Sequence, residues 1–287
     1  MYRIKELDAG EDISGFSTWL GHQGVKHRIT REGDAQVLWL ASAEQSAAVL
    51  AALEQYMSEE DVRARVDRAG RMPVRGGRWQ PSPRHAPVVC AIIAVAAVLA
   101  WATGLGRGEL AAWLMYVDPR GFDWQTLAAR LSALSDTMAS GQFWRLITPD
   151  FLHFSLMHIL FNAVMLWFLG SQVEYIDGRG RFLALFLVSS LISNTLQFLA
   201  SGPLFGGLSG VVYGVLGYCW LSQQRVPRFQ FPPALMTFAV VWMIIGFTPL
   251  PVMLGIGRMA NEAHLGGLLG GLLMAVIMTP PRSRQVS

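Results

Sequence analysis

From residue 87 onward, the chain is a series of long apolar segments joined by polar connections. Most of these segments approach the ~20 residues that a helix needs to cross the ~30 Å hydrocarbon core of a membrane. The six segments are residues 87–105, 151–172, 181–200, 209–223, 233–250 and 262–279. Because a helix satisfies its own backbone hydrogen bonds in hydrocarbon, we expect an all-α polytopic membrane protein with a bundle of six transmembrane helices.

The charged residues are concentrated ahead of the first apolar segment. Only 15% of the 287 residues are charged, against about a quarter in soluble domains, which favours a membrane protein. Seven arginines and a single acid, Asp67, lie between Arg63 and Arg84. An apolar segment follows at once, so this run is typical of the cytoplasmic flank of a membrane helix and not of a nucleic-acid-binding patch. We therefore expect no nucleic-acid partner and a cytoplasmic amino terminus, and six crossings return the carboxyl terminus to the same side.

A small α+β domain is expected before the membrane region. Residues 25–30 and 35–40 alternate between apolar and polar and are joined by a polar turn around Gly33, which predicts a β-hairpin. Ser42 begins a sequence with capping-box spacing ahead of a helix through about Tyr56. The expected organisation is a cytoplasmic domain at 1–65, a basic linker at 66–86, the membrane domain at 87–279 and a cytoplasmic tail at 280–287.

Neither metal nor cofactor chemistry is indicated by the sequence. The two cysteines, Cys90 and Cys219, lie far apart inside apolar segments and have no CxxC spacing, so we expect them to be core residues. We expect no metal ion and no cofactor. Haem ligation by the histidines is an alternative that a Soret band would reveal.

Three polar side chains are predicted to lie at one depth in the membrane. With a cytoplasmic amino terminus, the second, fourth and sixth segments all run from outside to inside. Ser209 stands 14 residues before the end of its segment, or ~21 Å of helix, which leaves it ~10 Å below the outer hydrocarbon surface. His158 and His264 stand 14 and 15 residues before the ends of theirs, and Asn162 lies one turn below His158 on the same face. A hydroxyl and imidazoles are costly in hydrocarbon, so this layer indicates a functional site.

The chain before Ser209 and the nearby glycines predict how such a site forms. Residues 201–207 must enter the membrane without being helical, which is tolerated only where backbone is buried in protein or lines a water-filled cavity. A tight hairpin before a merely short helix is the alternative. Gly267 and Gly271 share a face with His264, and small residues at this spacing allow close helix packing. That packing would bring Ser209 Oγ within hydrogen-bond reach of His264.

Three short motifs carry a resemblance to a known family. They are His153-Phe154-Ser155-Leu156-Met157-His158-Ile159-Leu160-Phe161-Asn162, Gly207-Leu208-Ser209-Gly210 and Ala263-His264-Leu265-Gly266-Gly267. In order, spacing and placement on the second, fourth and sixth segments, they resemble the six-helix rhomboid family of intramembrane serine proteases. The resemblance covers the membrane region from Trp144 to about Gly271 and, more weakly, the first domain. It implies a multi-pass protein of a bacterial inner membrane, acting on transmembrane protein substrates within the lipid bilayer.

The resemblance implies a role for each residue of the polar layer. Ser209 would be the nucleophile and His264 the general base, forming a dyad. The oxyanion would be bound by the Ser209 backbone N–H and by the side chains of His158 and Asn162. Tyr213, one turn below Ser209, would stack on the His264 ring. Further support would come from Gly207, Gly267 and Gly271.

The surroundings of the dyad are also predicted. Phe161 and Trp242 would line a lateral substrate gate between the second and fifth helices, and residues 247–254 would cap the cavity. No third acid completes a triad, because Glu262 points to another face and Glu174 lies at the far end of its helix.

Other classes of protein fit the sequence less well. A transporter or channel also places polar residues at mid-depth, but it usually has intramembrane acids, which these segments lack. A soluble-type esterase is disfavoured because Val211 occupies the last glycine position of Gly-x-Ser-x-Gly. The alternative that stays open is a catalytically inactive rhomboid-like module that binds membrane proteins, although it should lack Ser209 or His264. The first domain is a candidate for regulation or for self-association into a homodimer.

Overall fold

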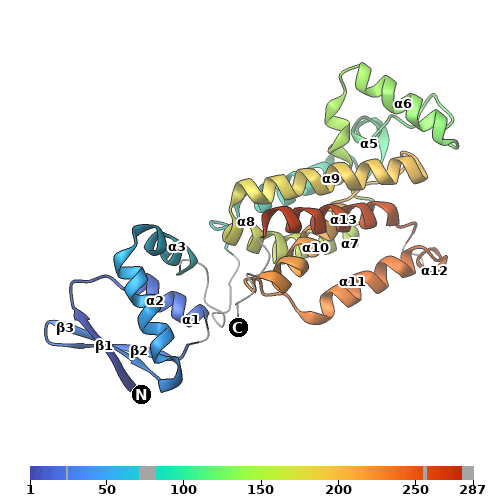
Figure 1. Cartoon of the computed structure of the whole chain (residues 1–287). Coiled ribbons are helices and arrows are strands. Elements are labelled where there is room, and N and C mark those ends of the chain that lie inside the picture. Colours follow the sequence, from blue (N-terminus) through green and yellow to red (C-terminus); the bar gives the residue numbers. More distant parts are fainter. Residues whose placement is uncertain (24, 71–81, 255–256, 280–287) are drawn as a thin grey trace. The chain divides into compact units, whose positions relative to one another are not determined.

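The computed structural model describes residues 1–23, 25–70, 82–254 and 257–279. The predicted tail at 280–287 and residues 71–81 of the predicted linker lie outside the described residues. The chain divides into two compact units, Met1–Gln80 and Pro81–Ser287. The first contains a small sheet with helices and the second is a helical bundle (Figure 1). The chain is therefore mostly helical, with a small sheet domain at its amino terminus.

The first unit is built on a three-stranded antiparallel sheet. Its strands are β1 (Tyr2–Asp8), β2 (His27–Glu32) and β3 (Ala35–Leu40), in the order β1-β3-β2. Its helices are α1 (Ser14–His22), the 3₁₀ turn η1 (Ala43–Gln45), α2 (Ser46–Ser58) and α3 (Glu60–Gly70). The pairing of Glu32 with Ala35 confirms the predicted hairpin, with Gly33 in its turn at φ 65°. The sequence signals do not predict β1 or α1, and α3 continues past residue 65, where the linker is expected to begin.

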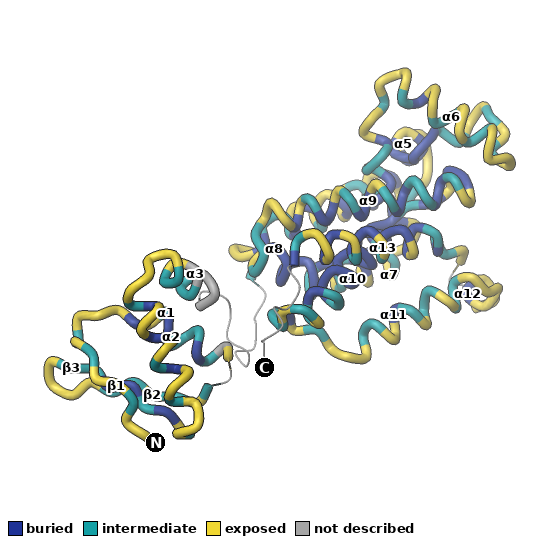
Figure 2. The backbone as a smooth tube through the Cα atoms, viewed as in Figure 1, coloured by how far each residue is buried: buried dark blue, intermediate teal, exposed yellow. Residues whose placement is uncertain are grey.

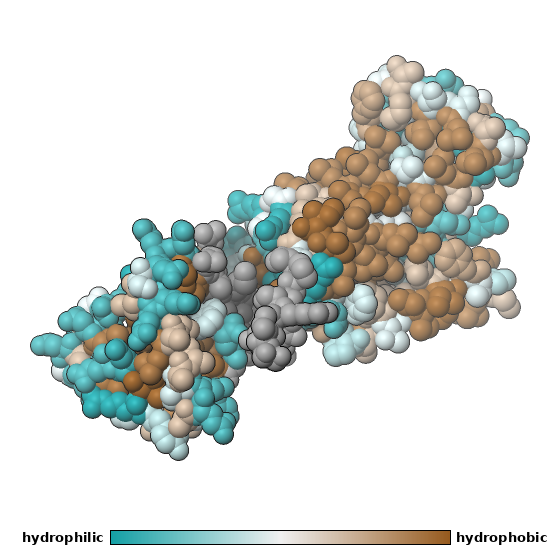
Figure 3. Space-filling view, viewed as in Figure 1, coloured by the Kyte–Doolittle hydropathy of each residue, from teal (hydrophilic) through white to brown (hydrophobic). Residues whose placement is uncertain are grey.

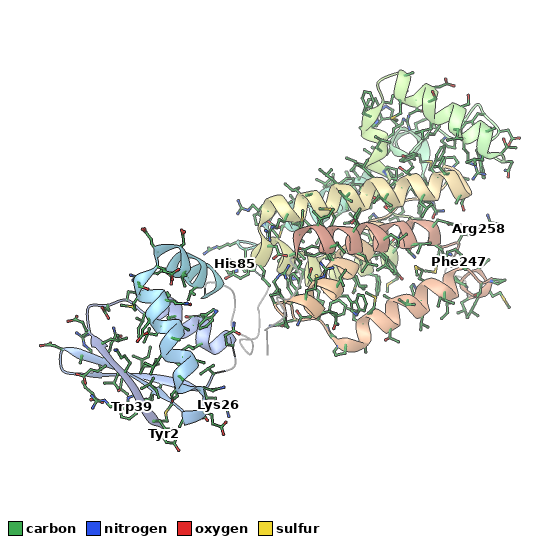
Figure 4. The ribbon with its side chains drawn as sticks, viewed as in Figure 1. Tyr2, Lys26, Trp39, His85, Phe247 and Arg258 are labelled. Atoms are coloured by element: carbon green, nitrogen blue, oxygen red, sulfur yellow. The ribbon has the colours of Figure 1, made fainter. Side chains whose placement is uncertain are left out.

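The core of the first unit lies between the sheet and the helices. Phe16 of α1, Leu38 of β3 and Tyr56 of α2 are each 1% exposed and belong to one apolar cluster. Trp39, labelled in Figure 4, follows Leu38 in β3, and its indole N–H donates a hydrogen bond to Thr30 Oγ1 at 2.7 Å. Because neighbouring strand residues point to opposite faces, β3 packs one face on the helices and leaves the Trp39 face to cross-strand contacts.

Every regular element in the described part of the second unit is a helix or a helical turn. Its first part comprises α4 (Pro87–Ala102), α5 (Gly108–Leu114), α6 (Leu127–Ala139) and the 3₁₀ turns η2 (Phe143–Leu146) and η3 (Thr148–Phe151). Then follow α7 (Leu156–Met165), the π-helical segment η4 (Leu166–Gly170), α8 (Ser171–Asp177) and α9 (Arg179–Ser201). The last are α10 (Ser209–Arg225), α11 (Pro233–Gly246), α12 (Leu250–Met253) and α13 (Asn261–Met278). Helix α13 packs between α9 and α10 (Figure 1), and α10 is the most deeply buried helix of this group (Figure 2).

Several of these helices have the length and apolarity of membrane spans. Among the described residues, three are long and apolar enough to cross a membrane: Leu156–Asp177, Arg179–Ser201 and Asn261–Met278. The helices Pro87–Ala102 and Pro233–Gly246 are apolar but shorter. The visible face of this unit is largely apolar (Figure 3), and side chains such as Trp101, 83% exposed, are suited to contact with lipid.

In the second apolar segment, the helix begins several residues after the point that hydropathy predicts. Helix α7 starts at Leu156, not at residue 151, because the Ser155 hydroxyl accepts a hydrogen bond from the His158 backbone N–H at 3.2 Å and caps the helix. The residues before Ser155 include the turn η3, so apolar composition alone misplaced this boundary. The predicted fifth segment also ends early, since α11 stops at Gly246 and the short α12 follows.

The long connection after α4 is tied down by Arg145. This connection holds the two short helices α5 and α6, and Thr126 is the N-cap of α6. The Arg145 guanidinium is 3% exposed and donates to the backbone carbonyls of Ala112 and Met115 at 2.9 and 2.8 Å. These bonds hold the carboxyl end of α5 against η2.

Glu174 has a structural role at the other end of the bundle. Its carboxylate is 2% exposed and accepts hydrogen bonds from the backbone N–H groups of Val88 and Val89 at 3.0 and 2.8 Å. An acid at a helix amino terminus satisfies donors that have no partner inside the helix. Glu174 therefore caps α4, which agrees with its exclusion as a third catalytic acid.

Candidate active site

The structure brings Ser209 and His264 together. Ser209 is the first residue of α10 and His264 lies in the first turn of α13. The distance between Ser209 Oγ and His264 Nε2 is 3.0 Å, which is a hydrogen bond. The imidazole is only 6% exposed, so the pair lies inside the bundle.

Glycines allow α10 and α13 to touch backbone to backbone. A β-carbon built on Gly267 would lie 1.9 Å from the carbonyl oxygen of Gly210, and one on Gly271 would lie 1.8 Å from that of Gly214. No side chain fits at such distances, so the predicted glycine face is a steric requirement of the fold. This close packing sets the separation between the helices that carry Ser209 and His264.

Tyr213 orients the imidazole from one side. Its ring stacks on His264 with the centroids 4.5 Å apart and the planes at 19°, as predicted. Its hydroxyl donates to the carbonyl oxygen of Ala239 at 2.8 Å, a contact with α11 that the sequence does not predict.

His264 Nδ1 is buried and, within the described part of the chain, has no hydrogen-bond partner. The nearby Glu262 instead accepts from Ser201 Oγ at 3.2 Å. The arrangement is a pair and not a triad.

His158 and Asn162 lie beside the loop that leads to Ser209. Gly207 has φ 116°, and a β-carbon there would meet His158 Cε1 at 2.6 Å and Asn162 Nδ2 at 3.6 Å. Only glycine can take this backbone conformation and this proximity without strain. Asn162 is 1% exposed, and its Nδ2 has no partner among the described residues. A buried amide donor without an acceptor is available to a ligand oxygen in this place.

The loop before Ser209 is irregular and is held by hydrogen bonds to Pro149 and His153. The Gly207 N–H donates to the carbonyl oxygen of Pro149 at 2.9 Å, and the Leu208 N–H donates to His153 Nε2 at 3.4 Å. His153 is fully buried and its ring centroid lies 5.0 Å from that of His158. His153 thus anchors the loop. Most of this irregular segment is buried in protein, although Leu204 is 59% exposed.

The two predicted gate residues lie on α7 and α11. Phe161 on α7 is half exposed, and Trp242 on α11 stacks on Phe238 of its own helix with centroids 6.2 Å apart. Among the described residues no ring contact joins Phe161 to Trp242. The predicted cap contains α12 and carries Phe247, which is 56% exposed and is labelled in Figure 4 near Arg258.

Replacing Tyr213 with phenylalanine is expected to loosen α11 while keeping the imidazole in place. The stacking ring remains, and only the hydrogen bond to the Ala239 carbonyl is lost, which costs about 1 kcal/mol. Thermal unfolding in detergent should show a small decrease in Tm for Tyr213→Phe and a larger decrease for Tyr213→Ala. Equal effects of the two substitutions would contradict the separate roles of ring and hydroxyl.

Comparison with known proteins places this arrangement in a family. A rhomboid domain model matches residues 140–281, and a rhomboid N-terminal domain model matches residues 1–65. The rhomboid protease GlpG of Serratia proteamaculans (strain 568) is 35% identical over 279 residues, which are 96% of this chain and 96% of that protein. The rhomboid proteases GlpG of Yersinia pestis (strain Pestoides F) and Yersinia pseudotuberculosis serotype O:3 (strain YPIII) are each 46% identical over 147 residues, covering 50% of this chain and 51% of theirs. The chain therefore belongs to the rhomboid family of intramembrane serine proteases.

Proposed function

We propose that this protein hydrolyses a peptide bond in or near a transmembrane segment of its substrate, with Ser209 as nucleophile and His264 as general base. The observation that carries the proposal is the 3.0 Å hydrogen bond between Ser209 Oγ and His264 Nε2 inside an apolar bundle. With the imidazole proton on Nδ1, Nε2 is free to accept the hydroxyl proton. The stack on Tyr213 keeps the ring facing the serine.

The reaction follows from these positions. Ser209 Oγ bonds to the scissile carbonyl carbon while its proton moves to His264 Nε2, and the imidazolium then protonates the leaving amine. An acyl-enzyme on Ser209 remains; His264 takes a proton from the water that attacks its carbonyl carbon, and returns the proton to Ser209 Oγ as the Oγ–carbon bond breaks and the acid leaves. The developing oxyanion is met by the Ser209 N–H and by the side chains of His158 and Asn162. The unpartnered Asn162 Nδ2 supports this assignment.

The substrate is proposed to reach the dyad from the side, between α7 and α11. Among the described residues of α11 only Ala239 is buried, and its carbonyl oxygen accepts the hydrogen bond from the Tyr213 hydroxyl of α10. Phe161 and Trp242 border this side. A helical substrate must unwind locally, because its carbonyls are otherwise hydrogen-bonded and shielded. The freed strand could pair with the loop backbone around Gly206, and the family resemblance suggests a small residue before the scissile bond.

The membrane topology is proposed to have six spans with both termini in the cytoplasm of a bacterium, in its inner membrane. The three long apolar helices, the shorter α4 and α11, and α10 would make up the six. Helix α10 has 17 residues, or ~26 Å, so Ser209 at its amino end would lie below the outer surface. The first unit would be cytoplasmic and is the candidate for self-association into a homodimer.

The direct test is cleavage of a tagged single-pass membrane protein by the purified full-length chain in liposomes. Cleavage together with labelling of Ser209 by a fluorophosphonate, located by mass spectrometry, would support the proposal. A protein that binds the substrate but neither cleaves it nor reacts at Ser209 would instead be the inactive binding module. The retained Ser209–His264 geometry argues against that alternative.

Asn162→Ala is expected to lower kcat by ~10²–10³-fold and leave KM nearly unchanged, because an oxyanion donor acts mainly in the transition state. Residual cleavage should remain measurable, since the dyad and the Ser209 N–H are intact. Val164→Ala is a matched control on the same helix, with a side chain that is 63% exposed. A kcat for Asn162→Ala equal to that of this control would remove Asn162 from the oxyanion site.

A further inference from the structure

A carboxyl group that the proposed reaction does not use lies near the site. Asp150, in the turn η3, is 0% exposed. Its carboxylate accepts hydrogen bonds from Asn194 Nδ2 at 3.0 Å and from the Ser190 hydroxyl, both on α9. Among the described residues no cation forms an ion pair with it. Burying a carboxyl group without a cation is costly, so these two hydrogen bonds are what stabilise it there.

The residues next to Asp150 support the loop that precedes the nucleophile. The carbonyl oxygen of Pro149 accepts from the Gly207 N–H at 2.9 Å, and His153 Nε2 accepts from the Leu208 N–H at 3.4 Å. The same Pro149 oxygen would lie 2.9 Å from a β-carbon on Gly206. The segment around Asp150 is therefore in direct contact with the backbone that leads to Ser209.

Helix α9 contacts both sides of this arrangement. Its residues Ser190 and Asn194 hold Asp150, and the intervening Ser193 packs on α10, where its Oγ would lie 2.6 Å from a β-carbon on Gly210. Asn194 Nδ2 also donates to the Leu146 carbonyl at 3.1 Å, just before η3. One rigid helix thus sets the position of η3 relative to the start of α10.

We propose that Asp150 is a positioning residue of the oxyanion site, which fixes Pro149 against α9 and thereby holds the Gly207–Leu208 backbone that orients the Ser209 N–H. The inference rests on the proposed function, because that function assigns the Ser209 N–H to the oxyanion. Asp150 touches no reacting atom. It acts through the Pro149 carbonyl, which receives the Gly207 N–H.

Asp150→Ala should lower kcat by about 10²-fold with little change in KM, since a misplacement of about 1 Å at a reacting centre has an effect of this size. A peptide aldehyde provides a second readout. Ser209 Oγ adds to its carbonyl carbon, the proton passes to His264, and the aldehyde oxygen becomes a hemiacetal oxyanion in the same site. Its Ki should rise by a comparable factor. Because Ki does not depend on the fraction of folded enzyme, a merely structural role would not raise it.

Three further variants separate positioning from packing. Asp150→Asn can accept from Asn194 and donate to the Ser190 hydroxyl, so its kcat and Ki should stay near the wild-type values. Ser189→Ala removes a buried hydroxyl from the same helix that has no partner among the described residues, and it should also leave both values unchanged. Asn194→Ala removes the partner's half of one of the two hydrogen bonds to Asp150. Like Asp150→Ala, it should lower kcat and raise Ki.

The outcomes distinguish this inference from the proposed function. If the wild type cleaves and the Ki of the folded alanine variants equals that of the wild type, the positioning role is wrong and the protease assignment stands. The same conclusion follows if Asp150→Asn loses as much kcat as Asp150→Ala. If Asp150→Ala does not fold, Asn194→Ala and Asp150→Asn decide the matter by the same Ki comparison. A wild type that cleaves no substrate and does not bind the aldehyde overturns the proposed function and the inference with it.

Discussion

Ser209→Ala is expected to abolish cleavage, with kcat lowered by about 10⁶-fold as in other enzymes that lose a serine nucleophile. The reason is that Oγ forms the covalent bond to the substrate, and no other hydroxyl is placed beside His264 Nε2 in the described structure. Stability should change little, because the hydroxyl makes its one recorded hydrogen bond to His264. The measurement is gel-based cleavage of a tagged membrane substrate in liposomes, beside thermal unfolding of each variant.

Two companion variants make the result specific. Ser201→Ala removes an exposed hydroxyl that donates to Glu262, and it should retain cleavage. His264→Ala should be as inactive as Ser209→Ala and should lose labelling by a fluorophosphonate. Retained cleavage in Ser209→Ala would exclude this serine as the nucleophile. A large decrease in Tm for either variant would assign the loss of activity to folding instead.

Gly271→Ala is expected to destabilise the membrane unit by about 3 kcal/mol, at the upper end of the cost of overpacking. The new methyl group would lie 1.8 Å from the Gly214 carbonyl oxygen and 2.6 Å from its carbon, and both are backbone atoms that cannot rotate away. Helices α10 and α13 must then separate, which also moves His264 away from Ser209. Thermal unfolding in detergent should show a Tm lower by roughly 10 °C, with cleavage reduced even below that temperature.

Gly180→Ala is the matched control for this substitution. Gly180 is also a helical glycine, in the first turn of α9, but no atom lies within 4 Å of its added β-carbon. Alanine there should be neutral or slightly stabilising, because it reduces the conformational freedom of the unfolded chain. If Gly271→Ala and Gly180→Ala had the same Tm, the backbone contact between α10 and α13 would not be the source of stability inferred here.

Local signals explain both the successes and the errors of the sequence predictions. The apolar segments and the hairpin around Gly33 depend on neighbouring residues, and the structure contains them. The start of α7 was misplaced because Phe151 and Leu152 are apolar yet lie outside the helix that Ser155 caps. Hydropathy reports where a residue is buried and does not distinguish a helix from a buried turn.

Contacts between distant residues were harder to predict. Helical spacing identified Gly267 and Gly271 as one face, and the structure shows which carbonyls they meet. By contrast, Asp150 was missed altogether. Its partner Asn194 is 44 residues away in the chain, and no local pattern relates the two.

The sequence by itself determined that the chain is a membrane protein, and it predicts that Ser209, His264, His158 and Asn162 lie in one layer. Hydrophobic length and helix rise are properties of single segments, so they can be read without a fold. Only the tertiary structure decided the 3.0 Å contact of Ser209 with His264, the free Nδ1 and the anchoring of the Ser209 loop. Such distances depend on how separate helices pack, and that packing is set by side chains far apart in sequence.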